Sequence, residues 1–308
     1  MTRGGPREVS VRVPATSANI GPGFDSFGIA MGLYDDLTAR IIDGPSRVDV
    51  SGVAADDVPR DGSNLIVQAA ARVFDELGEP AHNIDLTCVN RIPHGGGLGS
   101  SAAATVAGML LARDLVPAGA ALTRTDILRL ATEMEGHPDN VAPAIFGGLT
   151  VSYFRADGSV GCIRHEVHPT IRLMVFTASA HSSTKTTRAM LPELIPHADA
   201  AANSAATAVL LHAMTDDPSY LMDGTIDRLH QSYRASAMPE SAQLVAELRS
   251  AGIAAVISGA GASVLALVDR HLELSAWQAP GFESAELAVD QVGAQSQVNA
   301  LTDATTAD

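Results

Sequence analysis

The segment from Pro93 to Ala104 constrains this chain more than any other part of it. It reads Pro-His-Gly-Gly-Gly-Leu-Gly-Ser-Ser-Ala-Ala-Ala, which predicts a strand, a glycine-rich turn and a helix in succession. Glycines let backbone N–H groups approach an anion closely, and the first turn of a helix presents N–H groups that have no intrahelical partner. The segment therefore predicts a loop that holds phosphate, with the hydroxyls of Ser100 and Ser101 beside it.

Three better-known glycine motifs do not fit this segment. A Walker loop ends in Gly-Lys-Ser or Gly-Lys-Thr, and the only lysine of the chain is Lys185, far from the loop. A dinucleotide fingerprint that began at Gly95 would need glycine where Ser100 stands. A hydrolase elbow with Ser100 as the nucleophile would need glycine at Ala102. A glycine run that only turns a strand into a helix remains the simplest alternative.

Two further glycine-rich segments strengthen the interpretation of the first. Pro14–Asp25 reads Pro-Ala-Thr-Ser-Ala-Asn-Ile-Gly-Pro-Gly-Phe-Asp, and Ser258–Ser263 lies between two apolar runs. Three such segments in this order resemble the GHMP kinases, the superfamily of galactokinase, homoserine kinase, mevalonate kinase and phosphomevalonate kinase. The resemblance extends from about Val9 to about Asp290. At Glu135–Pro143 and Ser183–Arg188 it is to the homoserine kinase branch in particular.

The order of predicted strands and helices indicates an α+β fold. The length of 308 residues and the 46% of hydrophobic residues are sufficient for roughly two packed domains. We expect the domains to be residues 1–160 and 161–308, and the resemblance implies the two-domain GHMP kinase fold with the active site in the cleft. Strands are expected at 9–13, 48–50, 84–88, 149–154, 160–167 and 170–177, and helices at 66–77, 101–111, 127–134, 200–213 and 240–251. Thr123 followed three residues later by Asp126 has the spacing of a capping box and marks the start of the helix expected at 127–134.

Charge and cysteine content limit the classes of partner. A formal net charge of −15 argues against nucleic acid, whose backbone is bound by basic surfaces. The same charge repels ATP at long range, so an ATP site would have to rely on local backbone dipoles, Mg²⁺ and a few arginines. Cys88 and Cys162 suggest two reduced thiols. Without a signal peptide or an apolar run long enough for a membrane helix, we expect a cytoplasmic protein without a membrane partner.

The resemblance implies ATP and Mg²⁺ as the ligands of the glycine-rich segment and its surroundings. Mg²⁺ prefers a few protein oxygens together with water and phosphate, and Ser101 and Glu135 match the family's metal-binding positions. Glu133 is the competing carboxylate. The residues implied in nucleotide binding are Asn64, Pro93, His94, Gly95, Gly96, Gly97, Leu98, Gly99, Ser100, Ser101, Ala102 and Ala103.

The substrate implied by the resemblance is L-homoserine, a small zwitterion with a hydroxyl group. The planar fork of arginine suits a carboxylate, and Arg188 and Arg234 match the family's substrate arginines. The full set of implied substrate residues is Asn19, Asp25, His137, Asn140, Thr184, Arg188 and Arg234. The implied catalytic residues are Asn140, which would orient the acceptor hydroxyl, Asp139 as a base or a structural anchor, Glu135 and Ser101.

We therefore expect ATP-dependent phosphorylation of the side-chain hydroxyl of L-homoserine to O-phospho-L-homoserine, in threonine biosynthesis. A GHMP kinase for another small alcohol, such as a mevalonate-like compound or an amino alcohol, is the first alternative. A non-catalytic binding protein of the same fold is the second, and a hydrolase built from Ser100, His137 and Asp139 is a distant third. Self-association into a homodimer is left open. Two positions depart from the family pattern, because Ala262 and Ser232 stand where proline is usual; the same chemistry is expected.

Overall fold

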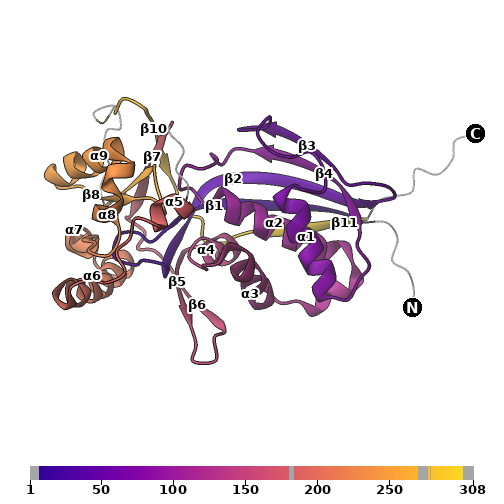
Figure 1. Ribbon diagram of the computed structural model, residues 1–308, viewed down its shortest axis with the longest axis horizontal. Helices are drawn as coiled ribbons and strands as arrows, with labels where there is room; N and C mark the ends of the chain where they lie inside the picture. The colour runs from indigo at the N-terminus through magenta and orange to yellow at the C-terminus, as the bar shows by residue number, and fades with distance from the viewer. Residues whose placement is uncertain (1–6, 180–183, 270–276, 278, 301–308) are drawn as a thin grey trace, which may run out of the picture.

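The chain folds into two lobes that lie end to end along its longest axis (Figure 1). This computed structural model describes residues 7–179, 184–269, 277 and 279–300. A seven-stranded sheet covered by helices forms one lobe, and a four-stranded sheet with further helices forms the other. The mixture of helices and strands without a regular alternation confirms the predicted two-domain α+β fold.

The first sheet has β1 and β2 at its centre. Its strands are β1 (Arg7–Ala18), β2 (Phe27–Ile42), β3 (Arg47–Gly52), β4 (Asn83–Asn90), β5 (Leu149–Phe154), β6 (Val160–His165) and β11 (Gln295–Ala300). The main order is β11-β1-β2-β4-β3, while β5 pairs with the start of β2 and β6 pairs with β5. Among the described strands of this sheet, β3 and β4 form the one parallel pair. The other neighbouring strands pair in antiparallel fashion.

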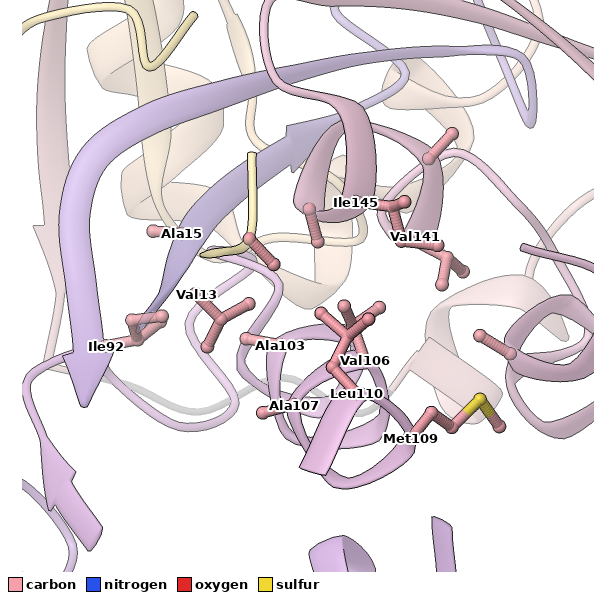
Figure 2. Close-up of a cluster of buried hydrophobic side chains, with 14 of the residues drawn as sticks. Val13, Ala15, Ile92, Ala103, Val106, Ala107, Met109, Leu110, Val141 and Ile145 are labelled. Atoms are coloured by element: carbon pink, nitrogen blue, oxygen red, sulfur yellow. The ribbon is translucent and has the colours of Figure 1, made fainter. Parts of the chain in front are cut away.

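The helix after the glycine-rich segment, α2 (Ser100–Leu115), is the centre of this lobe. Its run of alanines and aliphatic residues has no polar face, and eleven of its residues are buried, as its composition predicts. Around it pack α1 (Leu65–Glu76), η1 (Pro117–Ala121), α3 (Arg124–Glu135), α4 (Val141–Phe146) and the first sheet. The side chains that meet there in Figure 2 include Val13, Ala15, Ile92, Ala103, Val106, Ala107, Met109, Leu110, Val141 and Ile145. The glycine-rich segment is thus attached to a helix whose residues are mostly buried in the core of the first lobe.

The start of α3 confirms the expected capping box. The Thr123 hydroxyl accepts from the backbone N–H of Asp126, and the Asp126 carboxylate accepts from the backbone N–H of Thr123 at 2.8 Å. Two N–H groups at the helix end are satisfied in this way. The helix that begins there carries Glu135 at its last position, so this cap fixes one end of an element of the site.

The second sheet is buried on both faces at β8 (Ala254–Ile257) and β9 (Val264–Val268), whereas its edge strand β10 (Phe282–Leu287) is mostly exposed. Its fourth strand is β7 (Arg172–Ala178), and the strands pair in the antiparallel order β10-β7-β9-β8. Alternate residues of β9 belong to different hydrophobic clusters: Leu265 joins the main core, and Val264 joins a cluster beside α9. A strand covered on both faces reads as a continuous apolar run, as β9 does.

The helices of the second lobe gather at one end of the molecule (Figure 1). They are α6 (His197–Thr215), η2 (Pro218–Tyr220), α7 (Leu221–Gly224), α8 (Gln231–Arg234), η3 (Ala235–Ala237) and α9 (Pro239–Ser250). The short α5 (Thr184–Arg188) stands nearer the middle of the molecule, close to β1 and β2. No helix within the described ranges is both long enough and apolar enough to cross a membrane.

Sheet membership does not change at the expected boundary of residue 160. β6 begins at Val160 and still belongs to the first sheet, and β11 returns to that sheet by pairing with β1, with Arg7 opposite Ala300. We propose on this basis that the main change of lobe falls between β6 and β7, and that the last strand belongs to the first lobe. Three strands have no counterpart in the sequence interpretation: the long β2, with glycines and adjacent aspartates along it, β10, and the polar β11.

Candidate functional site

The three glycine-rich segments meet at the junction of the lobes. The backbone N–H of Thr16 donates to the carbonyl of Leu98 at 3.0 Å, and the N–H of Ser263 donates to the carbonyl of Gly96 at 3.1 Å. The Ser258 hydroxyl donates to the carbonyl of Gly97 at 2.6 Å and lies 2.8 Å from Ser17 Oγ. Segments that lie far apart in the sequence therefore form one hydrogen-bonded unit.

A cleft of about 620 Å³ opens on this unit. Its walls come from the glycine-rich segments, from the start of α2, from the end of α3 and the residues after it, and from α5. The lining residues are Gly95, Gly97, Gly99, Ser100, Ser101, Ala102, Glu135, Gly136, His137, Asn140, Arg188, Gly259, Ala260 and Gly261. Ten of the residues that the sequence indicated thus share one cavity.

The loop of residues 95–99, called the phosphate loop below, ends in a helix start without a side-chain cap. Gly99 is the N-cap of α2 with φ 72°, and no side chain of the described residues bonds to the helix there. A Cβ atom on Gly99 would lie 1.9 Å from Thr16 Oγ1, so both its conformation and its neighbour require glycine. The first N–H groups of α2, at Ser100 and Ser101, are left for an anion in the cleft.

Glu135 closes one side of this helix start. The hydroxyls of Ser101 and Thr105 donate to Glu135 Oε1 at 2.9 and 2.8 Å. The competing Glu133 faces elsewhere, because its carboxylate pairs with Arg72 and Arg129 at 3.2 and 2.9 Å. Serine and carboxylate oxygens next to a phosphate loop are the donor set that Mg²⁺ prefers. In the part of the chain that the structure describes, no cluster of three or more histidine, cysteine or acidic residues could hold a metal ion.

A second cavity of about 250 Å³ lies on the other side of Ser100 and Ser101. Apolar side chains from β1, β2, β3 and α1 line most of it, and Asn64 and His94 also reach it. Asn64 is the N-cap of α1, since its Oδ1 accepts from Ile66 N at 2.9 Å, and its Nδ2 donates to Pro59 O at 2.8 Å. Both ends of its amide are thus engaged by the fold.

The remaining predicted nucleotide residues support the loop from behind. Leu98 and Ala103 are buried in the main core, and Gly96 is buried with its carbonyl bonded to the third glycine-rich segment. Pro93, at the start of the segment, is half-buried and lines neither cavity. None of these four residues lines the cleft, and Gly96 has no side chain, so any contribution to binding would come from their backbone atoms.

Two polar pairs lie beside the cleft, and one of them, Thr16 with Asn140, is next to Gly99 of the phosphate loop. His137 Nδ1 lies 2.7 Å from Asp139 Oδ1, and this hydrogen bond raises the pKa of His137 above its ordinary value, although burial opposes the shift. Asp139 is only 2% exposed. The Thr16 hydroxyl donates to Asn140 Oδ1 at 2.9 Å, which leaves the Nδ2 amino group of Asn140 as its donor toward a ligand.

Arg188 and Asp25 form a bidentate ion pair. The two guanidinium nitrogens lie 2.8 and 2.6 Å from the two carboxylate oxygens, and the carboxylate raises the pKa of Arg188. Each of these residues was expected to hold one charge of a zwitterion. The structure brings the two expected partners of the substrate's charges together at the mouth of the cleft.

Arg234 is 2% exposed and lies behind Arg188. Its Nε donates to Thr187 O at 3.3 Å, and its Nη1 lies 3.3 Å from His230 Nδ1. Burial lowers the pKa of Arg234, and the nearby charge of Arg188 lowers it further. Burial likewise lowers the pKa of His230, whose Nε2 lies 2.9 Å from the carbonyl of Gly21.

Asn19 joins two of the glycine-rich segments. It is 4% exposed, its Nδ2 donates to Gly259 O at 2.9 Å, and its Oδ1 accepts from the N–H of Asp25 at 2.9 Å. The amide therefore fixes the backbone that carries Asp25. The remaining predicted substrate residue is Thr184, whose side chain lies outside what the structure describes.

Several residues of the site were not singled out from the sequence. Thr105 follows Ser101 by four positions, so helical spacing could have found it. Thr16, Phe24 and Gly259 stood inside the glycine-rich segments without an assigned role. Ala262, one of the two departures from the family pattern, is buried, and its carbonyl accepts from the Ser241 hydroxyl.

Known protein families match both lobes of the chain. The family model described as GHMP kinases N terminal domain matches residues 64–148, and the one described as GHMP kinases C terminal matches residues 210–282. The first match includes the phosphate loop, α2, Glu135 and Asn140. The second includes α8 and the third glycine-rich segment.

Individual proteins match over most of their length. The chain is 47% identical to a homoserine kinase of Streptomyces coelicolor, over 93% of both chains. It is 50% identical to a homoserine kinase of Clavibacter michiganensis subsp. michiganensis, over 85% of this chain and 83% of that one. Among solved structures, a homoserine kinase from Cytophaga hutchinsonii superposes with a TM-score of 0.80 at 26% identity, over 94% of this chain and 97% of that one.

Proposed function

Because this chain belongs to the GHMP kinase family and, within it, to the homoserine kinases, we propose that it transfers the terminal phosphoryl group of ATP to the side-chain hydroxyl of L-homoserine. One observation carries the proposal beyond the family relationship. A single cleft has uncapped helix N–H groups on one wall and a guanidinium paired with a carboxylate on another. Such a cleft can hold a phosphate chain and a zwitterion at the same time.

The nucleotide would lie across the start of α2. Its phosphates would accept from the N–H groups of the phosphate loop and from Ser100 and Ser101. The cavity of about 250 Å³ beyond these serines is mostly apolar, which suits the flat ring of adenine. Cys88 lines that cavity, and burial raises the pKa of its thiol to about 12, so the thiol stays protonated and uncharged beside the base.

We propose that Ser101 and Glu135 hold Mg²⁺. Their oxygens already converge at 2.9 Å beside the phosphate loop, and the Thr105 hydroxyl holds the same carboxylate oxygen from one turn along α2. When bound, the ion would neutralise charge that develops on the transferred phosphoryl group. The protein's own part is to hold the Glu135 carboxylate beside the phosphate loop through the hydroxyls of Ser101 and Thr105.

The acceptor would enter between Asp25 and Arg188. The substrate's carboxylate would replace Asp25 on Arg188, and its ammonium group would replace Arg188 on Asp25, so no charge is left unpaired. The Nδ2 group of Asn140 would donate to the acceptor hydroxyl and orient it. Asp139 serves as an anchor in this proposal, because its buried Oδ1 already holds His137.

An ADP-release assay with homoserine, serine, threonine, mevalonate and galactose as acceptors tests the proposal. We expect turnover with homoserine to exceed turnover with every other acceptor. A preference for an uncharged alcohol would point to another GHMP kinase activity. Binding of ATP and homoserine without any ADP release would favour a non-catalytic binding protein of this fold.

The setting of the reaction follows from the proposed product. O-phospho-L-homoserine would be an intermediate of threonine biosynthesis, and we propose the cytoplasm as its site, because ATP is available there and Cys88 and Cys162 are free thiols. We also propose a homodimer, since the hairpin of β5 and β6 carries Phe154 at 59% and Ile163 at 50% exposure. Sedimentation of the full chain tests the homodimer.

A further inference from the structure

The ring of Phe24 lies against three cationic or aromatic side chains at the substrate side of the cleft. The guanidinium carbon of Arg188 and that of Arg234 each lie 5.4 Å from the centre of the ring. The imidazole of His230 stacks on the same ring, with centroids 5.1 Å apart and an angle of 28° between the planes. Side chains from α5 and from the region of α8 therefore converge on one residue of the first glycine-rich segment.

The positive charges of Arg188 and Arg234 lie near each other, and the carboxylates of Asp25, Asp139 and Asp227 are close enough to offset part of the resulting repulsion at Arg234. Arg188 has the carboxylate of Asp25, but within the described residues no carboxylate lies in ion-pair distance of Arg234. Like charges in a buried place repel, and the lowered pKa of Arg234 reflects both its burial and the nearness of Arg188. An aromatic face offers partial negative charge without an ionised group, so it can hold both guanidiniums without neutralising either.

The position of the ring is fixed from both lobes. Asn203 Nδ2 and Thr207 Oγ1, both on α6, donate to the carbonyl of Pro22 at 2.8 and 3.0 Å. The neighbouring carbonyl of Gly21 lies 2.9 Å from His230 Nε2. The turn that carries Phe24 thus belongs to the first lobe by sequence and is held by helices of the second.

We infer that Phe24 is a specificity-determining positioning residue, whose ring sets the separation of Arg188 and Arg234 and so keeps both guanidiniums directed at the substrate's carboxylate. The inference rests on the proposed function, because it needs a substrate that carries a carboxylate. It goes beyond that function by assigning carboxylate selectivity to an aromatic side chain that makes no hydrogen bond.

The test compares two acceptors in four proteins. Homoserine and 3-aminopropan-1-ol differ by the carboxylate alone, so the ratio of their kcat/KM values measures carboxylate selectivity. In Phe24→Leu we expect this ratio to fall about 10- to 30-fold, with most of the loss in the KM for homoserine, as for the loss of desolvated cation–π contacts. Phe24→Tyr keeps the ring face and should retain a ratio within about threefold of the wild type.

A matched control separates selectivity from packing. Phe27→Leu removes a ring three residues further on, at the start of β2, where Phe27 is 3% exposed and belongs to the main hydrophobic core. We expect it to lower stability and to leave the selectivity ratio unchanged. A merely structural role for Phe24 would lower kcat/KM for both acceptors alike and leave the ratio intact, and that result overturns the inference.

The remaining outcomes are also decisive. If Phe24→Leu does not fold, Phe24→Met takes its place as the ring-free variant. Failure of both to fold would show that the ring serves the fold, which contradicts the inference. A wild-type protein that does not phosphorylate homoserine refutes the proposed function, whereas a wild-type homoserine kinase whose Phe24→Leu variant keeps its selectivity refutes only the role of Phe24.

Discussion

On one wall of the cleft, the phosphate loop offers backbone N–H groups held by backbone hydrogen bonds. Another wall carries the side chain of Arg188, which lies against Phe24, and the buried Arg234 lies against the same ring, so this side-chain wall is built from three distant segments. The backbone wall has a fixed shape, since its atoms are part of the packed junction of three segments. The side-chain wall depends on charged side chains, of which Arg188 pairs with Asp25. We expect substitutions on the backbone wall to affect folding and nucleotide binding together, and those on the side-chain wall to affect one substrate.

The largest expected effect tests the backbone wall. Gly97 has φ +79°, and a Cβ atom there would lie 2.3 Å from Ser258 O and 2.9 Å from Gly261 O. We expect Gly97→Ala to lower the free energy of unfolding by about 3–5 kcal/mol, through strain and backbone clash, and to abolish measurable ATP binding. Urea unfolding and calorimetric titration with ATP measure the two effects.

The neighbouring glycine supplies the control for that substitution. A Cβ atom on Gly96 would meet nothing closer than Ser263 Oγ, at 3.4 Å, and its φ is not positive. We expect Gly96→Ala to change stability by less than about 1 kcal/mol and to keep ATP binding. Equal losses in the two variants would mean that the loop tolerates no side chain anywhere, and the structural account of Gly97 would be wrong.

The next effect tests the side-chain wall. Arg188→Leu should lower kcat/KM for homoserine by a factor that corresponds to a loss of about 2–5 kcal/mol of transition-state binding. The reason is that a charged group of the substrate loses its partner. Arg188→Lys should recover only part of the loss, since an ammonium group cannot form the bidentate contact. ATP affinity measured without homoserine should stay nearly constant in both variants.

A surface arginine serves as the reference for this prediction. Arg228 pairs with Asp199 at 3.0 Å, and its side chain is 50% exposed. Arg228→Leu should change kcat/KM for homoserine by a factor that corresponds to less than about 1 kcal/mol of transition-state binding. If ATP affinity falls in Arg188→Leu as strongly as homoserine turnover does, the two walls are not independent and the comparison drawn above fails.

Glu135 lies between the two walls, and its substitution should act on turnover. We expect Glu135→Gln to lower kcat about 100-fold while the KM for homoserine changes less than about threefold, because the carboxylate acts on developing charge. Glu133→Gln is the matched control. It breaks surface ion pairs with Arg72 and Arg129 and should cost only about 0.5 kcal/mol of stability. A loss of turnover in Glu133→Gln alone would assign the metal to the other carboxylate.

The smallest expected effect concerns His137 and pH. Its pKa in the folded protein is raised by the hydrogen bond to Asp139, so the pair stabilises the fold fully below the unfolded pKa of about 6.5, and this contribution is lost as the pH rises through the raised folded value. The stability difference between the wild type and His137→Gln should therefore be larger near pH 5.5 than near pH 9. An equal difference at both pH values would contradict the charged pair.

Backbone features of the site could be predicted from the sequence because glycines occur where the chain needs a positive φ or a close backbone approach. The phosphate loop, the buried α2 and the capping box of α3 all follow from residue types at fixed local spacing. The long β2 was missed because Gly28, Gly32 and two aspartates interrupt its apolar alternation. Its register with β1 and β4 depends on neighbours that the local sequence does not specify.

Side-chain partnerships were harder to predict. The sequence named Asp25 and Arg188 separately as ligands for opposite charges, but their pairing with each other depends on where α5 lies. The ring of Phe24 received no role, because a lone phenylalanine carries no spacing signal. Only the fold brings it to two arginines that are more than 160 residues further along the chain.

The return of β11 to the first sheet bears on how the molecule can be made. The ribosome produces β1 before the other strands of this sheet, and the strand that covers its open edge emerges more than 280 residues later, since Arg7 pairs with Ala300 and Arg12 with Gln295. During that interval the nascent first lobe exposes an unsatisfied sheet edge, which is a template for wrong pairing with other chains. Completion of this lobe is therefore an event that follows translation of the second, and a fragment that stops at β6 would be released with that edge uncovered.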